Sequence, residues 1–141
     1  MIAVNTSQTF RTRINLSEES REQLIAALNQ QLADTFDLYS QTKQAHWNVK
    51  GAQFIALHEL FDALAAELQA YVDLIAERAT ALGGLALGTT RMAAENSRLP
   101  ECVLEITDSL ATVDALAERY AALAASTRSA IEVAEGQHDA A

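Results

Sequence analysis

Residues 54–84, FIALHELFDALAAELQAYVDLIAERATALGG, decide the fold of this chain. Apolar side chains recur every three or four positions along the stretch, and the pair Gly83-Gly84 ends it. This spacing places them on one face of an α-helix, and glycine is a frequent residue at helix C-termini. We predict one long helix from about Phe54 to Leu82. The residues assigned to its core-facing side are Leu57, Leu60, Phe61, Leu64, Leu68, Tyr71, Val72, Ile75 and Leu82.

A second long helix is predicted before this stretch. Ser17, followed by Glu18 and Glu19, is typical of a helix start, because a serine hydroxyl caps free N–H groups and the helix dipole favours acids in the first turn. The helical period of apolar residues then continues to about Val49, and Gly51 stops it. The two helices are therefore joined by a short turn.

A third long helix follows a long connection. Asp108 can cap a helix whose apolar positions keep the helical period until Gly136. Residues 83–107 form the connection, with one brief helix predicted over residues 89–95. A crossover of this length suggests that the first two helices lie on one side and the third lies across the bundle.

The composition agrees with a single all-α domain. The chain has 141 residues, half of them hydrophobic, with only five glycines and one proline. We expect one domain over residues 1–141, with residues 1–16 as an N-terminal tail. Cys102 is the only cysteine, so no disulfide can form within the chain. Neither a signal peptide nor a membrane-spanning run is indicated, and we expect a cytoplasmic protein without membrane contact.

Four metal-ligand side chains form a stripe on the helix predicted over residues 54–82. With His58 at 0°, Asp62, Asp73 and Glu77 lie at about 40°, 60° and 100° on the helical wheel. Asp62 and Asp73 are about 16 Å apart along the axis, too far to ligate adjacent metal ions in one chain.

A second copy of the same helix can bring the two pairs together. An antiparallel copy crossing near Glu67 and Leu68 places one chain's His58 and Asp62 level with the other chain's Glu77 and Asp73. His46, just before the turn between the first two helices, can add a nitrogen ligand. The sequence therefore predicts two equivalent metal sites in a twofold dimer.

The ligand types indicate the class of metal. Two imidazoles with three carboxylates and no thiolate suit Fe(II), Mn(II) or Zn(II), and iron with redox chemistry fits an oxygen-rich set best. Two alternatives remain: the pairs on the helix are ordinary surface pairs, or the metal ligands are Glu135 and His138. The latter have the E-x-x-H spacing of ferritin-like bundles, but Gly136 breaks the helix between them.

The residues around the stripe closely resemble the Dps mini-ferritins. The resemblance covers most of the chain from the first helix to the third. Its segments are TKQAHWNVKG at 42–51, Phe54, His58, Phe61-Asp62, Asp73, AERA at 76–79, LGG at 82–84, ALGTT at 86–90 and LAERY at 116–120.

This resemblance implies a ferritin-like four-helix bundle subunit, assembled as twofold dimers into a hollow dodecamer. It implies ferroxidase centres with His46, His58 and Asp62 from one subunit and Asp73 and Glu77 from its mate. Such proteins oxidise Fe(II), preferably with hydrogen peroxide and also with oxygen, store the ferric product as mineral, and protect DNA from oxidative damage. Trp47 matches the family's tryptophan beside the centre.

Two departures from the family pattern bear on function. DNA-condensing members usually carry a lysine-rich tail, whereas this N-terminus has no lysine and the net charge is −9, which argues against direct DNA binding. The family's last helix would begin around Asp139, so we expect that helix to be missing from the given sequence. Two rival functions stay open: a nucleoid-associated DNA-compacting protein with secondary metal binding, and a helical interaction module.

Overall fold

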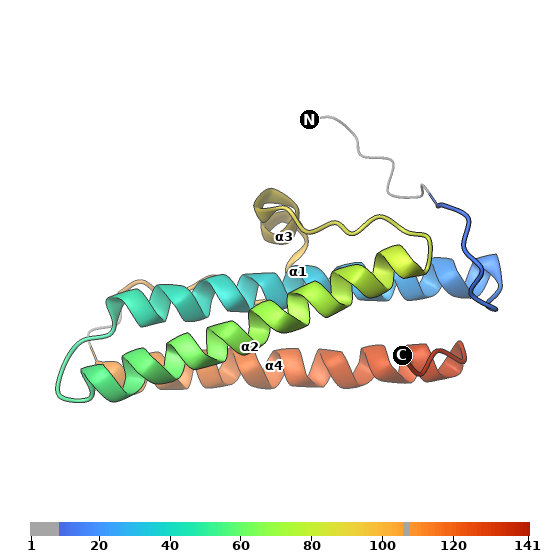
Figure 1. Ribbon diagram of the computed structural model, residues 1–141. Coiled ribbons are helices and arrows are strands. Elements are labelled where there is room, and N and C mark those ends of the chain that lie inside the picture. The colour runs from blue at the N-terminus through green and yellow to red at the C-terminus, as the bar shows by residue number, and fades with distance from the viewer. Residues whose placement is uncertain (1–8, 106–107) are drawn as a thin grey trace.

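The computed structural model describes residues 9–105 and 108–141, which form three long helices and one short helix (Figure 1). The helices are α1 (Glu18–Asn48), α2 (Phe54–Ala81), α3 (Thr90–Asn96) and α4 (Ser109–Gly136). All four predicted helices are confirmed, as is the all-α class. Within the described ranges, none of the helices combines the length and the apolar run that crossing a membrane needs.

Side-chain caps explain where three of these helices begin. The Ser17 hydroxyl accepts a hydrogen bond from the Ser20 N–H at 3.1 Å, as predicted for the start of α1. The carboxylate of Asp108 accepts from the Leu110 N–H at 3.2 Å at the start of α4. Thr89 caps α3 in the same way. Such caps satisfy N–H groups that have no partner within the helix.

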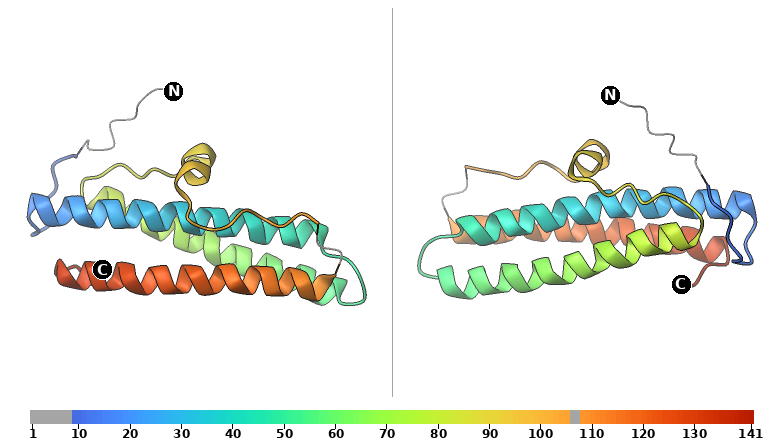
Figure 2. Two further views of the ribbon diagram at one scale, coloured as in Figure 1. Left: turned by 180° about the vertical axis from the view of Figure 1, so that it is seen from behind. Right: turned by 45° about the horizontal axis from the view of Figure 1, so that its top comes forward.

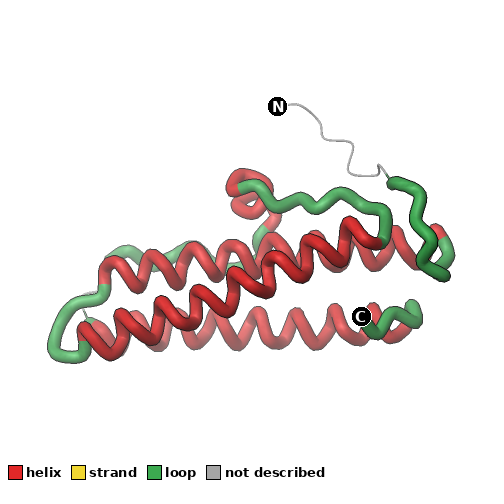
Figure 3. The backbone as a smooth tube through the Cα atoms, viewed as in Figure 1, coloured by secondary structure: helices red, strands yellow, loops and turns green. Residues whose placement is uncertain are grey.

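The helices form a layered bundle in which α1 contacts the three others. The crossover between α2 and α4 returns the chain to the end where α2 began, so α2 and α4 run in one direction and α1 runs against both (Figure 1). The same helix directions are visible from behind and in a view tilted so that the top comes forward (Figure 2). Apart from α3, the part of the crossover that the structure describes, up to residue 105, is loop (Figure 3). The third long helix therefore follows the crossover as predicted.

A row of polar side chains on α1 holds the crossover in place. They recur at helical spacing, and each binds one crossover residue. The pairs are Gln30 with Asn96, Asp34 with Arg98, Asp37 with Ser97 and Gln41 with Pro100. Asp34 is buried, and its carboxylate accepts bonds from the backbone N–H and the guanidinium of Arg98. The crossover is thus fixed by hydrogen bonds as well as by apolar packing.

The apolar core has two parts. The larger part joins α1, α2 and α4 through Leu38, Ala45, Val49, Phe61, Leu68 and Leu116. The smaller part lies where α1 begins and α2 ends, and consists of Leu24, Ile25 and Leu82, with Ile14 and Leu16 packed against it.

Gly83 shows how residues 9–16 lie along the end of α2. Its φ of 89° disfavours other residues, and a Cβ there would lie 2.4 Å from the carbonyl oxygen of Phe10. The Phe10 N–H donates to the Gly83 carbonyl at 2.6 Å. The division into one domain with a tail over residues 1–16 stays a prediction, and residues 1–8 of that tail lie outside the described residues.

Some residues that were predicted to lie in the core are exposed in the single chain. Leu60 and Tyr71 of α2 are 48% and 51% exposed, although both were expected to face the core. On α4, Leu110 and Ile131 are also exposed. The reason is geometric: α2 and α4 both pack on α1, and the described residues place no helix over the sides that these residues occupy.

Candidate metal centre

The turn between α1 and α2 brings two histidines into contact. Gly51, with a φ of 103°, lets the chain reverse within a few residues, so that His46 in the last turn of α1 meets His58 in the second turn of α2. Their rings stack with centroids 3.8 Å apart and planes inclined by 18°. The local turn therefore creates the histidine pair.

Each imidazole is oriented by the backbone of the other residue. Nδ1 of His46 lies 2.7 Å from the carbonyl oxygen of His58, and Nδ1 of His58 lies 2.8 Å from the carbonyl oxygen of His46. A carbonyl oxygen only accepts hydrogen bonds, so both Nδ1 atoms carry a proton. An imidazole with its proton on Nδ1 presents the lone pair of Nε2 to a metal ion, and such a hydrogen bond from the other nitrogen is common in metal-binding histidines.

Asp62 lies one turn after His58 and is held by a lysine. Its Oδ1 atom is 3.9 Å from Nε2 of His46 and 2.8 Å from Nζ of Lys43. The hydrogen bond and the charge of Lys43 hold the pKa of the Asp62 carboxyl below its usual value, although desolvation acts in the opposite direction. The Lys43 ammonium therefore occupies a position where a metal cation would meet the Asp62 carboxylate.

Asp73 and Glu77 lie farther along α2 and do not join this group. Both side chains are exposed, and the helical rise puts Asp73 about 16 Å from Asp62. Within residues 9–105 and 108–141, no three His, Cys, Asp or Glu side chains are close enough to hold one metal ion. The structure brings His46, His58 and Asp62 together, and the role of all five residues as ligands stays a prediction.

The surface beside Asp73 is shallow, and two of the residues that line it, Ala66 and Ala70, are small. A depression there is formed by Phe36 and Tyr39 of α1 and by Ala66, Gln69, Ala70, Val72 and Asp73 of α2. Small side chains on a helix surface allow another helix to approach closely. The two acids therefore lie next to a surface that can accept a partner helix.

Sequence reasoning missed the role of Lys43. It lies within the TKQAHWNVKG segment, but nothing local links it to Asp62, which is 19 residues away. The same ammonium lies 5.7 Å from the centre of the exposed Trp47 ring. Trp47 therefore lies near the lysine that binds Asp62 and is largely exposed.

The alternative pair Glu135 and His138 lacks the arrangement of a metal site on a helix. Glu135 is in the last turn of α4, but the helix ends at Gly136 and His138 follows with a φ of 62°. The expectation that Gly136 breaks the helix is confirmed.

Comparison of the chain with known proteins identifies its family. The ferritin-like domain family matches residues 25–141. The DNA protection during starvation protein of Agrobacterium fabrum is 42% identical over 128 residues, which are 89% of this chain and 77% of that protein. The chain belongs to the Dps family. The resemblance noted in the sequence is thus confirmed.

Solved structures agree with the Dps assignment. DpsC from Streptomyces coelicolor has a TM-score of 0.91 at 27% identity, over 99% of this chain and 81% of that one. DpsA14 from the same organism has a TM-score of 0.87 at 31% identity, over 92% and 77% of the two chains. The ferritin-like fold, with a short helix between α2 and α4, is therefore established for this Dps chain.

Proposed function

We propose that this protein is a ferroxidase and iron-storage protein whose metal sites are shared between two subunits. The main support is the pair His46 and His58. Each Nδ1 atom is hydrogen-bonded to a backbone carbonyl oxygen, so each Nε2 atom is available to bind a metal ion. Asp62 lies beside them, and Asp73 and Glu77 follow on the same side of α2. Fe(II) is the substrate of these sites.

The positions of the proposed ligands on α2 support a twofold arrangement. A twofold axis near Glu67 and Leu68 pairs residue 58 with residue 77 and residue 62 with residue 73, because both pairs have the same midpoint. Leu68 is buried in its own subunit and Glu67 is exposed, so the axis passes on the outer side of α2. The depression beside Asp73 allows the partner helix to approach. We propose that such dimers build a dodecameric shell.

The donor set suits the oxidation of iron. Hard carboxylate oxygens stabilise Fe(III) more than Fe(II), so binding itself favours oxidation. Two Fe(II) ions give two electrons to one hydrogen peroxide molecule, which takes up two protons and leaves as two water molecules. The Lys43 ammonium and the iron ion are both cations and compete for the same Asp62 oxygen. The ammonium must therefore move away from Asp62 when iron binds.

Protection of DNA then results from the removal of iron and peroxide in the cytoplasm. We propose this in preference to compaction of DNA, because the net charge of −9 opposes binding to phosphates. A gel shift at low and high salt tests the alternative: retention of DNA at neutral pH and physiological salt would favour a nucleoid-associated protein.

The decisive experiment replaces His58 with Ala and Asp62 with Asn together. Fe(II) and hydrogen peroxide are mixed anaerobically with protein, and ferric absorbance is followed in a stopped-flow instrument. We expect at least a tenfold loss of rate, as in other cases where metal ligation is disrupted. The control is Glu59→Gln, an exposed acid on the same helix outside the ligand set. Unchanged kinetics in the double variant, with helical content retained, would contradict the proposal.

A further inference from the structure

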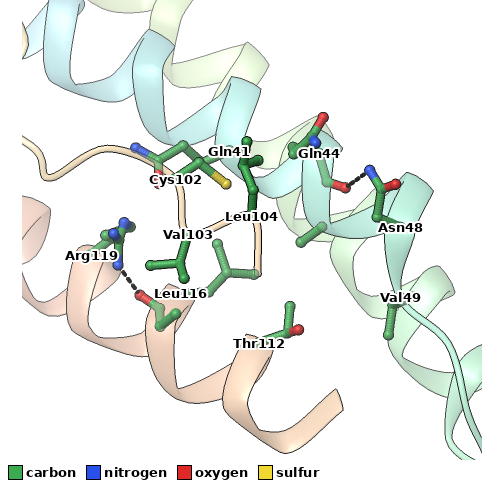
Figure 4. Close-up of a pocket in the computed structure, with 12 residues that line it drawn as sticks. Gln41, Gln44, Asn48, Val49, Cys102, Val103, Leu104, Thr112, Leu116 and Arg119 are labelled. Atoms are coloured by element: carbon green, nitrogen blue, oxygen red, sulfur yellow. Dashed lines mark hydrogen bonds between the residues drawn. The ribbon is translucent and has the colours of Figure 1, made fainter. Parts of the chain in front are cut away.

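A second site lies on the opposite side of α1 from the histidine pair. A partly open cavity of about 310 Å³ is formed by α1, the crossover and α4 (Figure 4). Val103, Leu104 and Leu116 form an apolar part of its wall, and Gln44 and Arg119 add polar groups. This volume is at the lower end of the range for small-molecule sites. None of the five predicted metal ligands lines it.

Arg119 places a buried positive charge in the wall of this cavity. Its side chain is 95% buried, since only 5% of the residue is exposed. Nη1 donates to the carbonyl oxygen of Ala115 at 2.8 Å, and Nη2 donates to the carbonyl oxygen of Glu101 at 2.5 Å. Nε is buried without a hydrogen-bond partner. The guanidinium is therefore only partly satisfied by the protein.

No acid neutralises this charge in the part of the chain that the structure describes. No carboxylate there lies within 4 Å of the Arg119 guanidinium, and residues 1–8 and 106–107 contain no Asp or Glu. Asp37, whose charge acts on the nearby Cys102 thiol, has its own carboxylate bonded to Ser97 and Gln41. A buried charge is unfavourable unless it is paired, so the cavity next to Arg119 favours an anion.

The lining narrows the kind of anion. One guanidinium balances one negative charge, and its planar donors match the two oxygens of a carboxylate. Val103, Leu104 and Leu116 provide apolar surface that an inorganic anion would not use. We propose that this cavity binds a small monocarboxylate, with its carboxylate at Arg119 and a short apolar tail against the crossover and α4.

The reactivity of the Cys102 thiol can report whether the cavity is occupied. It is the only cysteine of the chain and lines the cavity. Burial raises the pKa of its thiol above the usual value, so it should react slowly with thiol reagents. A molecule bound in the cavity should slow the reaction further, because it covers the sulfur.

The experiment measures the rate at which Cys102 of the full chain reacts with iodoacetamide at constant ionic strength. Butyrate is compared with butyramide, which has nearly the same shape without the charge, and with inorganic phosphate. We expect butyrate to protect Cys102 in a saturable way, with half-protection at roughly 1–10 mM, as befits a ligand of so few atoms. Butyramide and phosphate should give little protection.

Variants separate a specific site from general effects. Arg119→Gln should abolish protection by butyrate, whereas Arg128→Gln, which removes an exposed arginine from the same helix, should retain it. Thr112→Phe keeps the guanidinium and fills the cavity, so protection should also be lost. If Arg119→Gln does not fold, as judged by circular dichroism, Thr112→Phe decides the question.

Four results would overturn the proposal. The first three are equal protection by butyramide, protection by phosphate but not by butyrate, and protection by butyrate that survives in Arg119→Gln and in Thr112→Phe. Absence of protection by butyrate at about tenfold above the expected range would have the same meaning.

Discussion

Nζ of Lys43 lies 2.8 Å from Oδ1 of Asp62, between the last turns of α1 and the first turns of α2. The lysine holds the carboxylate beside the histidine pair, where it lies 3.9 Å from Nε2 of His46. It also keeps a positive charge in the place where a metal ion would bind. In the proposed metal site, Lys43 thus positions Asp62 and competes with the metal ion.

Replacing Lys43 with Met should strengthen metal binding several-fold. The variant keeps the apolar stem of the side chain and removes the ammonium that competes for Asp62. Anaerobic titration calorimetry with Fe(II) measures the affinity. Lys43→Arg, which retains the charge, serves as the control and should bind like the parent. Weaker binding by Lys43→Met would mean that positioning of Asp62 outweighs competition.

Mixing two inactive variants tests whether the metal sites are shared. His58→Ala and Glu77→Gln should each be inactive alone, but a mixed dimer contains one intact site and one site that is damaged twice. When the two variants are refolded together, chains pair at random and about half of the dimers are mixed. Each mixed dimer has one intact site of its two, so about a quarter of all sites should be intact. Stopped-flow oxidation of Fe(II) measures the recovery.

The control for this experiment uses two variants on the same half of the site. His58→Ala mixed with Asp62→Asn leaves every site damaged, so no activity should return. Failure of the first mixture to recover activity, although mixed dimers form, would show that each site lies within one chain.

Asp34→Asn should destabilise the fold by about 2 kcal/mol, because bonds from the charged Arg98 and its backbone N–H to a buried carboxylate are weakened. The effect stays moderate because the Arg98 side chain is 52% exposed and can be solvated. Urea unfolding followed by circular dichroism gives the free energy of unfolding. Asp114→Asn, at an exposed position on α4, is the matched control, and an equal effect of both variants would argue against the crossover anchor.

Tyr120 should make the fold sensitive to alkaline pH. Burial raises the pKa of its phenol above the usual value for tyrosine, although a hydrogen bond with Thr42 opposes the shift. The folded state therefore holds the phenol proton more tightly than the unfolded state. The free energy of unfolding should fall once the pH rises past the pKa that Tyr120 has in the unfolded chain.

Tyr120→Phe removes this titration, so its free energy of unfolding should decline less steeply than that of the parent between about pH 9 and pH 11. Urea unfolding at several pH values measures both slopes. Tyr71→Phe, at an exposed tyrosine, is the control. Parallel curves for the parent and Tyr120→Phe would contradict the expected role of Tyr120.

The helices were predictable because their signals are local. Ser17 and Asp108 cap N–H groups within three residues, and the apolar spacing of α2 reports a period of 3.6 residues. The exposure of Leu60 and Tyr71 was not predictable, because it depends on which helices pack beside α2 and not on the period itself.

The sequence by itself determined the number and limits of the helices, the stripe of histidine and acidic residues on α2 and the family, since all of these depend on residue type and short-range spacing. Only the tertiary structure decided which distant groups meet. The reciprocal bonds of His46 and His58, the pair of Lys43 and Asp62, and the buried charge of Arg119 at the cavity each depend on how separate segments pack. Hydrogen bonds and ion pairs act over a few ångströms in space, and residues many positions apart reach that distance only in the folded chain.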